Sequence, residues 1–179
     1  MVDIKDKGEV LVFTGPGKGK TTAAIGVACR VIAQGGRVVF IYFTGPLYPV
    51  LGEVKTAAAL GGNWRMIGIK SEAIDATYLN GFSESVDTVK EALAMAHNLW
   101  LYECELLVLD DINPHLNRKN IDIPQVIALL DDRPPNTSII LTGQSAPEVI
   151  MKRADLVTEF LQIKQPFQLN VGPRKGIDF

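Results

Sequence analysis

The stretch "VLVFTGPGKGKTTAAIGVACR", residues 10 to 30, decides the fold. An apolar run at residues 10 to 13 predicts a strand, and residues 20 to 34 predict a helix that ends at Gly35 and Gly36. A glycine-rich turn joins the two. A helix that begins directly after such a turn points its free backbone N–H groups at an anion. This order of elements therefore predicts an α/β protein with a phosphate-binding loop.

The turn departs from the usual phosphate-binding pattern in its first residue and in its charge. That pattern is Gly, four residues, then Gly-Lys-Ser/Thr. Here Gly19, Lys20 and Thr21 fit its end, whereas Thr14 stands at the first glycine position and Lys18 adds a second lysine. Lys20 is expected to contact the outer phosphates, and Thr21 to offer its hydroxyl to Mg²⁺. Lys18 is either a further cation beside a triphosphate or a solvated surface lysine. The residues expected to bind nucleotide are Thr14, Gly15, Gly17, Lys18, Gly19, Lys20, Thr21 and Thr22.

An acidic pair supplies the second half of such a site. In "LLVLDD", residues 106 to 111, an apolar strand ends in Asp110 and Asp111. Strands of this kind deliver a carboxylate to the magnesium shell of a bound triphosphate. We therefore expect Thr21, Asp110 and Asp111 to bind Mg²⁺, although the spacing does not decide which aspartate lies nearer the metal. The alternative is an acidic pair that forms a turn or caps a helix. Arg30, on the first helix, would either reach the nucleotide or pair with a carboxylate.

Apolar runs and helical patterns alternate along the rest of the chain. Further strands are predicted at 38–43, 65–69, 106–109, 138–141 and 156–163, and further helices at 50–60, 83–100, 123–130 and 147–153. Residues 70–82 are expected to form a loop and 164–179 an irregular segment. Strands separated by helices predict a mostly parallel sheet with helices on both faces. Ligands of such sheets bind at the carboxyl ends of the strands, where the loop, Thr44-Gly45, Asp110-Asp111 and Thr142-Gly143 would meet.

Composition limits the class of protein and its partners. The 179 residues are 47% hydrophobic and 21% charged with a net charge of −2, which predicts one globular domain over residues 1–179. No Lys/Arg-rich tract occurs, so nucleic acid is not an expected partner. No apolar run approaches the ~20 residues of a membrane span, and the first eight residues lack an apolar signal core. We expect a cytoplasmic protein whose Cys29 and Cys104 are reduced.

Four stretches of the chain form a specific combination: "TGPGKGKTTAAIGVACR", "LVLDD", "LLDDRPPNTSIILTGQSAPEVIMKRADLVTEF" and "KQPFQLNVGPRKGIDF". Together, from about residue 9 to residue 179, they resemble the ATP:corrinoid adenosyltransferases of the CobA/BtuR type. Gly52-Glu53, after the second strand, matches a further family feature. A generic phosphate-loop enzyme would not be expected to share the last stretch, which makes the resemblance specific.

The resemblance implies a three-layer α/β/α P-loop domain of the RecA-like type with a mostly parallel sheet, assembled as a homodimer. It implies transfer of the 5′-deoxyadenosyl group of ATP to the cobalt of a reduced corrinoid, cobalamin, with release of inorganic triphosphate. A reductase protein would be a further partner. The whole triphosphate leaves in this reaction, so Lys18 and Lys20 with Mg²⁺ would stabilise its charge as catalytic groups. No general base is required, because the reduced cobalt is itself the nucleophile.

The corrin side departs from the family pattern. The family has a Gly-Phe-Thr-Trp stretch after the third strand, where this chain reads "RMIGIKSEAIDATYLNGF" and offers only Tyr78 or Phe82 as substitutes. It also usually has Asp-Glu where this chain has Asp110-Asp111. A diverged ATP- and corrinoid-binding protein without transferase activity is therefore one alternative. A phosphate-loop small-molecule kinase or ATPase is another; its product would be ADP, and it would need a base near the γ-phosphate, which the sequence does not offer.

Overall fold

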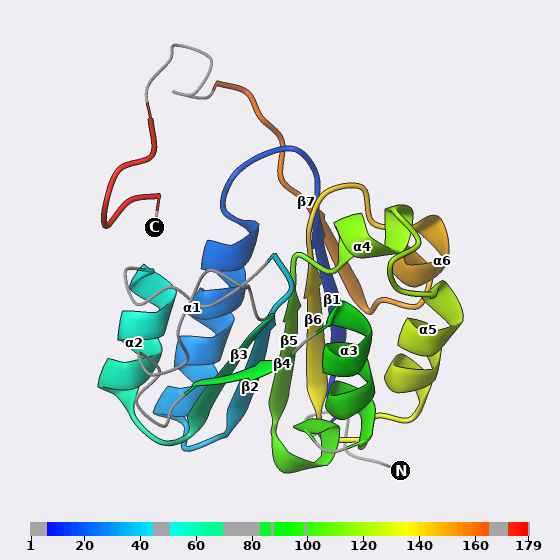
Figure 1. The fold of residues 1–179 in the computed structure, drawn as a ribbon, viewed down its shortest axis with the longest axis horizontal. Coiled ribbons are helices and arrows are strands. Elements are labelled where there is room, and N and C mark those ends of the chain that lie inside the picture. The colour runs from blue at the N-terminus through cyan, green and yellow to red at the C-terminus, as the bar shows by residue number, and fades with distance from the viewer. Residues whose placement is uncertain are drawn as a thin grey trace.

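A computed structural model describes residues 7–44, 51–69, 83–86, 88–98, 100–164 and 172–178. Seven strands form one sheet in the order β4-β3-β2-β5-β6-β1-β7, and each neighbouring pair is parallel (Figure 1). The strands are β1 (Val10–Thr14), β2 (Val38–Tyr42), β3 (Trp64–Ile69), β4 (Ser83–Val86), β5 (Leu106–Asp110), β6 (Ser138–Thr142) and β7 (Leu156–Glu159). The architecture is the expected α/β fold with a parallel sheet.

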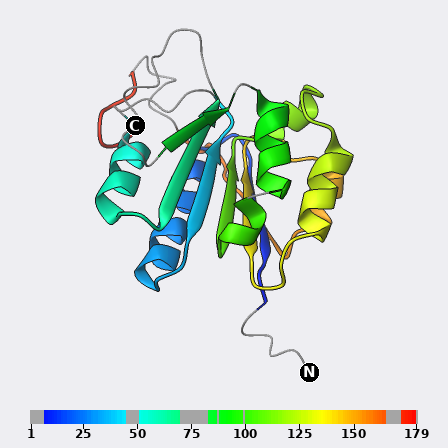
Figure 2. The same ribbon diagram turned by 60° about the horizontal axis from the view of Figure 1, so that its bottom comes forward.

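Helices cover both faces of the sheet, as Figures 1 and 2 show from two directions. The helices are α1 (Lys20–Ala33), α2 (Gly52–Leu60), α3 (Val89–Asn98), the 3₁₀ turn η3 (Trp100–Glu103), α4 (Asn113–Asn117), α5 (Ile123–Asp131) and α6 (Glu148–Met151). Helices α1 and α2 pack on one face through Ala24, Ala28 and Ala57. Helices α3 to α6 pack on the other. None of the helices in the described ranges is both long enough and apolar enough to cross a membrane.

The central strands are apolar throughout because both of their faces are buried. In β5, Leu106 and Val108 face the α1–α2 side, whereas Leu107 and Leu109 face the α3–α6 side. All four side chains are inaccessible to solvent. A parallel sheet covered on both faces requires such continuous apolar runs, which is why the strands could be recognised from the sequence.

The predicted helix at 83–100 is wrong at its start. Ser83–Val86 is the edge strand β4, paired in parallel with β3 from Met66 to Ile69. The helix begins only at Val89, and the chain tightens into the η3 turn at Trp100. Pairing with β3 satisfies the backbone N–H and C=O groups of residues 83–86, which explains why a helix-compatible sequence is extended here.

Two further elements differ from expectation. The last strand ends at Glu159 instead of 163, and the short helix α4 was not predicted. Helix α4 is only five residues long with Pro114 in its first turn, so it carries no periodic apolar signal. The predicted loop at 70–82 lies outside the described residues.

The strand order positions the predicted site. Strand β1 lies between β6 and β7, and β6 separates it from β5. The carboxyl ends of β1, β6, β5 and β2 are therefore consecutive along one edge of the sheet. The glycine loop, Thr142, Asp110 and Thr44 lie at those ends.

Candidate functional site

The glycine loop between β1 and α1 wraps around the side chain of Lys20. The Lys20 ammonium donates to the carbonyl oxygens of Gly15 at 2.8 Å and Gly17 at 2.6 Å. Gly15 (φ 94°) and Gly19 (φ 108°) adopt the left-handed conformation that glycine favours. Partial burial lowers the pKa of the Lys20 ammonium, although the negative charges of Asp111 and Asp110 act in the opposite direction. The loop thus holds a cation at its centre, next to the start of a helix.

The segment after β7 supports the loop from behind. The backbone N–H of Gly17 donates to the carbonyl oxygen of Phe160 at 2.7 Å, and the Phe160 N–H donates to that of Thr14 at 2.8 Å. A Cβ atom on Gly15 would lie 2.5 Å from the Phe160 carbonyl oxygen. The Phe160 ring meets that of Phe13 edge-on, with centroids 5.9 Å apart. Glycine is therefore needed at position 15 for the close approach of two main chains.

Thr14 has a structural reason to replace the usual first glycine. Its side chain is buried, and its hydroxyl oxygen accepts a hydrogen bond from the backbone N–H of Ala146 at 3.0 Å. This contact joins the loop to the segment that follows β6.

Asp110 is the carboxylate that faces the start of α1. It is 1% exposed and accepts hydrogen bonds from the hydroxyls of Thr142 at 2.7 Å and Thr21 at 3.2 Å. Burial raises the pKa of Asp110 to about 7, although both hydrogen bonds favour the ionised form. The charges of Asp111 and Glu53 add to the rise.

Asp111 turns away from Thr21 and faces the end of β2. Its carboxylate accepts from the Thr44 hydroxyl at 3.1 Å, and its N–H donates to the hydroxyl oxygen of Thr142 at 2.8 Å. The backbone of Asp111 has a φ of 60°, a conformation that aspartate tolerates better than most residues. The fold thus separates the two aspartates, which the sequence alone did not distinguish. Asp110 is the one in contact with the loop helix.

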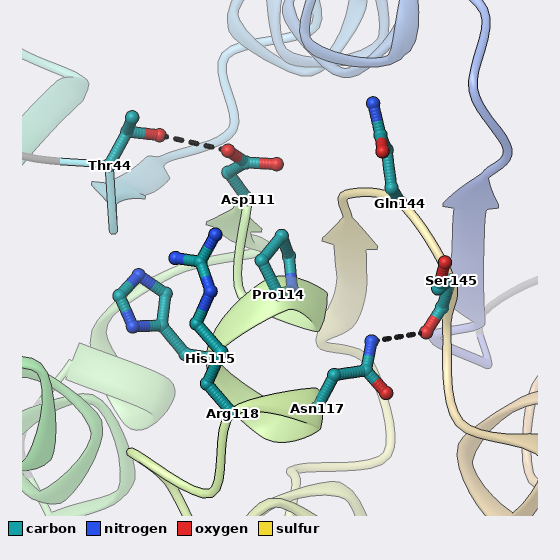
Figure 3. A pocket seen from close by; sticks show the side chains of 8 residues that line it. All are labelled: Thr44, Asp111, Pro114, His115, Asn117, Arg118, Gln144 and Ser145. Atoms are coloured by element: carbon teal, nitrogen blue, oxygen red, sulfur yellow. Dashed lines mark hydrogen bonds between the residues drawn. The ribbon is translucent and has the colours of Figure 1, made fainter.

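A cavity of about 500 Å³ opens beside Asp111. Figure 3 shows Thr44 and Asp111 at one side of it, Gln144 and Ser145 at another, and the side chains of α4 below. Its lining is largely polar: Thr44, Asp111, Pro114, His115, Asn117, Arg118, Gln144 and Ser145. A second cavity, of about 480 Å³, shares Gln144 and Ser145 and extends along Thr14, Gly15 and Glu159. The carboxyl edge of the sheet therefore offers space on both sides of the Gln144–Ser145 turn.

Helix α4 fixes the wall of the first cavity through His115. The Nε2 atom of His115 lies 3.0 Å from the carbonyl oxygen of Phe43, which can only accept, so Nε2 carries the proton. Nδ1 then accepts from the Asn120 amide at 3.3 Å. The sequence did not single out His115 or Arg118, because a helix of five residues has no periodic apolar pattern by which to identify it.

The remaining predicted residues lie at different distances from the loop centre. Lys18, whose side chain is 53% exposed, forms an ion pair with Asp178. Thr22 is exposed in the first turn of α1. Arg30 is exposed in the last turn of that helix, roughly 15 Å along the axis from Lys20 at 1.5 Å per residue. The described geometry does not bring Arg30 to the loop. The proposed corrin-side residues Tyr78 and Phe82 lie outside the described residues.

Comparison with known proteins identifies relatives along nearly the full chain. The sequence model of the family described as ATP:corrinoid adenosyltransferase BtuR/CobO/CobP matches residues 6–179. A corrinoid adenosyltransferase of Sinorhizobium sp is 32% identical over 185 residues, covering 97% of this chain and 81% of that protein. The corrinoid adenosyltransferase of Escherichia coli is 26% identical over 97% of this chain and 87% of its own. The corrinoid adenosyltransferase CobA of Salmonella typhimurium is 27% identical, with coverages of 98% and 87%.

Proposed function

The chain belongs to the ATP:corrinoid adenosyltransferase family, and we propose that it transfers the 5′-deoxyadenosyl group of ATP to the cobalt of cob(I)alamin. Cobalt would donate its electron pair to C5′ as the bond between C5′ and oxygen breaks, and inorganic triphosphate would leave with that bonding pair. The observation that supports this most is the phosphate loop of a family member, with the Lys20 ammonium held between two loop carbonyls.

The loop suits a reaction in which the whole triphosphate is the leaving group. The start of α1 and Lys20 offer positive charge beside the phosphates, and Lys18 offers a second ammonium on the outer side of the loop. Cations arranged along a triphosphate stabilise the charge that appears as it departs. We assign the binding role to Thr14, Gly15, Gly17, Gly19 and Thr22 with Lys18, Lys20 and Thr21, and the catalytic role to Lys18 and Lys20. Arg30 would bind the nucleotide only if that molecule extended to the far end of α1.

Magnesium fits the oxygen atoms beside the loop. The Thr21 hydroxyl and the Asp110 carboxylate are 3.2 Å apart, and Oε2 of Glu53 is buried with no hydrogen-bond partner among the residues that the structure describes. Oxygen donors of this kind are the ones Mg²⁺ prefers. We assign Thr21, Asp110 and Asp111 to the ion, which would supply charge neutralisation to the leaving triphosphate. The 2.7 Å hydrogen bond from the Thr142 hydroxyl would hold the Asp110 carboxylate in position to bind the ion.

The near surroundings of the loop favour this transfer over phosphoryl transfer. A kinase or ATPase must position a hydroxyl or water for attack on the γ-phosphate. In this protein Asp110 is buried and accepts from two threonine hydroxyls, while Asp111 accepts from Thr44. Both carboxylates are thus engaged in the structure. An attacking cobalt needs neither of them as a base.

The wider assignments rest on the composition of the chain and on the family resemblance. We propose that residues 1–179 form a single domain, that the protein is a cytoplasmic homodimer and that a reductase protein supplies the reduced corrinoid. The second candidate function is an ATP- and corrinoid-binding protein without transfer. The replacement of the Gly-Phe-Thr-Trp stretch by residues 65–82 of this chain favours that candidate.

An anaerobic assay with wild-type protein, Mg-ATP and chemically reduced cobalamin tests these functions together. The transferase should give light-sensitive adenosylcobalamin in the visible spectrum and an equal amount of inorganic triphosphate. ADP and phosphate as products would identify a kinase or ATPase instead. ATP binding by calorimetry without either product, also with other reduced corrinoids, would establish the binding protein.

A further inference from the structure

The turn Arg174–Asp178 lies on the phosphate loop although it is far from it in sequence. Asp178 closes the turn: its N–H donates to the Arg174 carbonyl oxygen at 2.8 Å, and its Oδ2 accepts from the Arg174 N–H at 2.8 Å. Its other oxygen, Oδ1, pairs with the ammonium of Lys18. The Asp178 side chain is only 13% exposed, and Figure 1 shows the segment, in red, at the same end of the molecule as the loop.

This contact brings a negative charge onto a cation that belongs to an anion site. Lys18 lies between Gly17 and Gly19, and the segment after β7 already touches the same loop through Phe160. The hydrogen bond from Lys18 holds the pKa of Asp178 below its ordinary value, so the carboxylate is ionised at neutral pH. An ionised carboxylate and a phosphate oxygen are alternative acceptors for one ammonium.

We propose that Asp178 competes internally for the phosphate loop. It binds Lys18 in the ligand-free protein, and a bound triphosphate takes Lys18 from it and releases the Arg174–Asp178 turn. The proposal rests on the proposed function in taking a triphosphate as the ligand of the loop. The turn would return when inorganic triphosphate leaves, so the same contact would favour release of a highly charged product.

The strength of the pair suits an exchange of partners. Lys18 is 53% exposed, and exposed ion pairs of this kind contribute little to stability and weaken with salt. A triphosphate carries several negative charges and also interacts with Lys20 and the start of α1. It therefore outcompetes one carboxylate. A group that competes in this way lowers the apparent affinity of its rival by a modest factor.

Trypsin reports on the contact without any ligand. It cleaves after Arg174 and Lys175, both exposed in the turn. Both Lys18→Ala and Asp178→Asn remove the ion pair and leave these two cleavage sites unchanged. We expect trypsin to cut both variants there several times faster than wild type. Lys152→Ala removes an exposed ion pair with Glu148 elsewhere and should be cut at the wild-type rate. Equal cleavage of all four proteins would overturn the contact. Inorganic tripolyphosphate should raise the cleavage rate of the wild type toward that of Asp178→Asn.

Calorimetric titration with inorganic tripolyphosphate tests the competition. Asp178→Asn should bind about threefold to fivefold more tightly than wild type at low salt, a factor within the range of exposed ion pairs. Asp178→Asn should bring no such gain in a Lys18→Ala background. A gain of equal size in both backgrounds would mean general charge repulsion and would overturn the exchange at Lys18. Binding by wild type with no gain in Asp178→Asn would overturn this proposal alone. No binding of tripolyphosphate or Mg-ATP by wild type would overturn it together with the proposed function.

Discussion

The backbone N–H of Gly17 donates to the carbonyl oxygen of Phe160 at 2.7 Å, so the phosphate loop is bonded to the chain that leaves β7. The shape of the loop therefore depends on two segments far apart in sequence. The backbone N–H of Gly17 is therefore not available to a bound anion. We expect the N–H groups from Lys18 onward to face the anion instead. Glycine in this loop therefore allows a close contact between two main chains, in addition to forming the turn.

Gly15→Ala should distort this junction. The new Cβ would lie 2.5 Å from the Phe160 carbonyl oxygen at a backbone φ of 94°, so the loop must move or bear strain of about 1–3 kcal/mol. We expect the affinity for Mg-ATP to fall at least tenfold and the melting temperature to fall. Gly26→Ala is the matched control, because Gly26 lies within α1 and a Cβ there would meet none of the described residues within 4 Å. It should keep the affinity and gain about 1 kcal/mol of stability. Unchanged affinity in Gly15→Ala would contradict the close approach.

Lys20→Ala should weaken ATP binding strongly. The Lys20 ammonium is held 2.8 Å and 2.6 Å from two loop carbonyls, and a charge-assisted contact of this kind with phosphate is worth about 1.5–3 kcal/mol. We expect an affinity loss of about 10- to 100-fold in calorimetric titration with Mg-ATP. Lys90→Ala, which removes an exposed lysine of α3, serves as the control and should bind as wild type. Wild-type affinity in Lys20→Ala would exclude the loop from nucleotide binding.

The stability of the nucleotide-free protein should depend on pH through Asp110. Its pKa is raised from 3.8 to about 7 in the native state, so between those values the native side chain holds a proton that the unfolded one has lost. Its stabilising contribution is therefore complete below about pH 4 and is lost as pH rises to about 7. The stability of wild type relative to Asp110→Asn should fall by about 1.4 kcal/mol per pH unit in this window. Urea unfolding between pH 4 and 8, without divalent cations, gives the difference. A difference independent of pH would show that Asp110 titrates normally.

The two thiols should react differently with iodoacetamide. Burial raises the pKa of Cys104 to about 12, so almost no thiolate is present at pH 8, whereas Cys29 on α1 is only partly buried. Native Cys29→Ala should therefore resist labelling, and native Cys104→Ala should be labelled. Guanidinium chloride should make both variants react at similar rates. Mass spectrometry of the labelled peptides measures both reactions. Rapid labelling of Cys104 in the native protein would mean that the residues packed around it open to solvent.

The sequence predicted the parts of this protein whose signals are local. The loop from Thr14 to Thr22 and the apolar strand before Asp110 each lie in a short stretch, and the structure brings Thr21 and Asp110 within 3.2 Å. The parallel sheet followed from apolar runs that only burial on both faces explains. The family resemblance was also visible from the sequence and is confirmed by the family match.

What the sequence could not predict depends on distant partners. Residues 83–86 form a strand because β3 is available to pair with them. The support from Phe160 is a main-chain contact and leaves no mark in the residue type, and the pairing of Asp178 with Lys18 joins opposite ends of the chain. The different surroundings of Asp110 and Asp111 arise from Thr142 and Thr44 on neighbouring strands. Each of these contacts joins segments that are far apart in sequence, so it can be derived only once the arrangement of the strands is known.

The position of β1 between β6 and β7 has a consequence for the newly made protein. The strand that carries the phosphate loop is synthesised well before β6 and β7, its two neighbours in the sheet. Until these are synthesised, the edges of β1 remain unpaired, and Phe160 is not present to support Gly17. An unfinished chain therefore exposes an apolar strand that chaperones can recognise. It gains a supported nucleotide loop only after Phe160 has been synthesised.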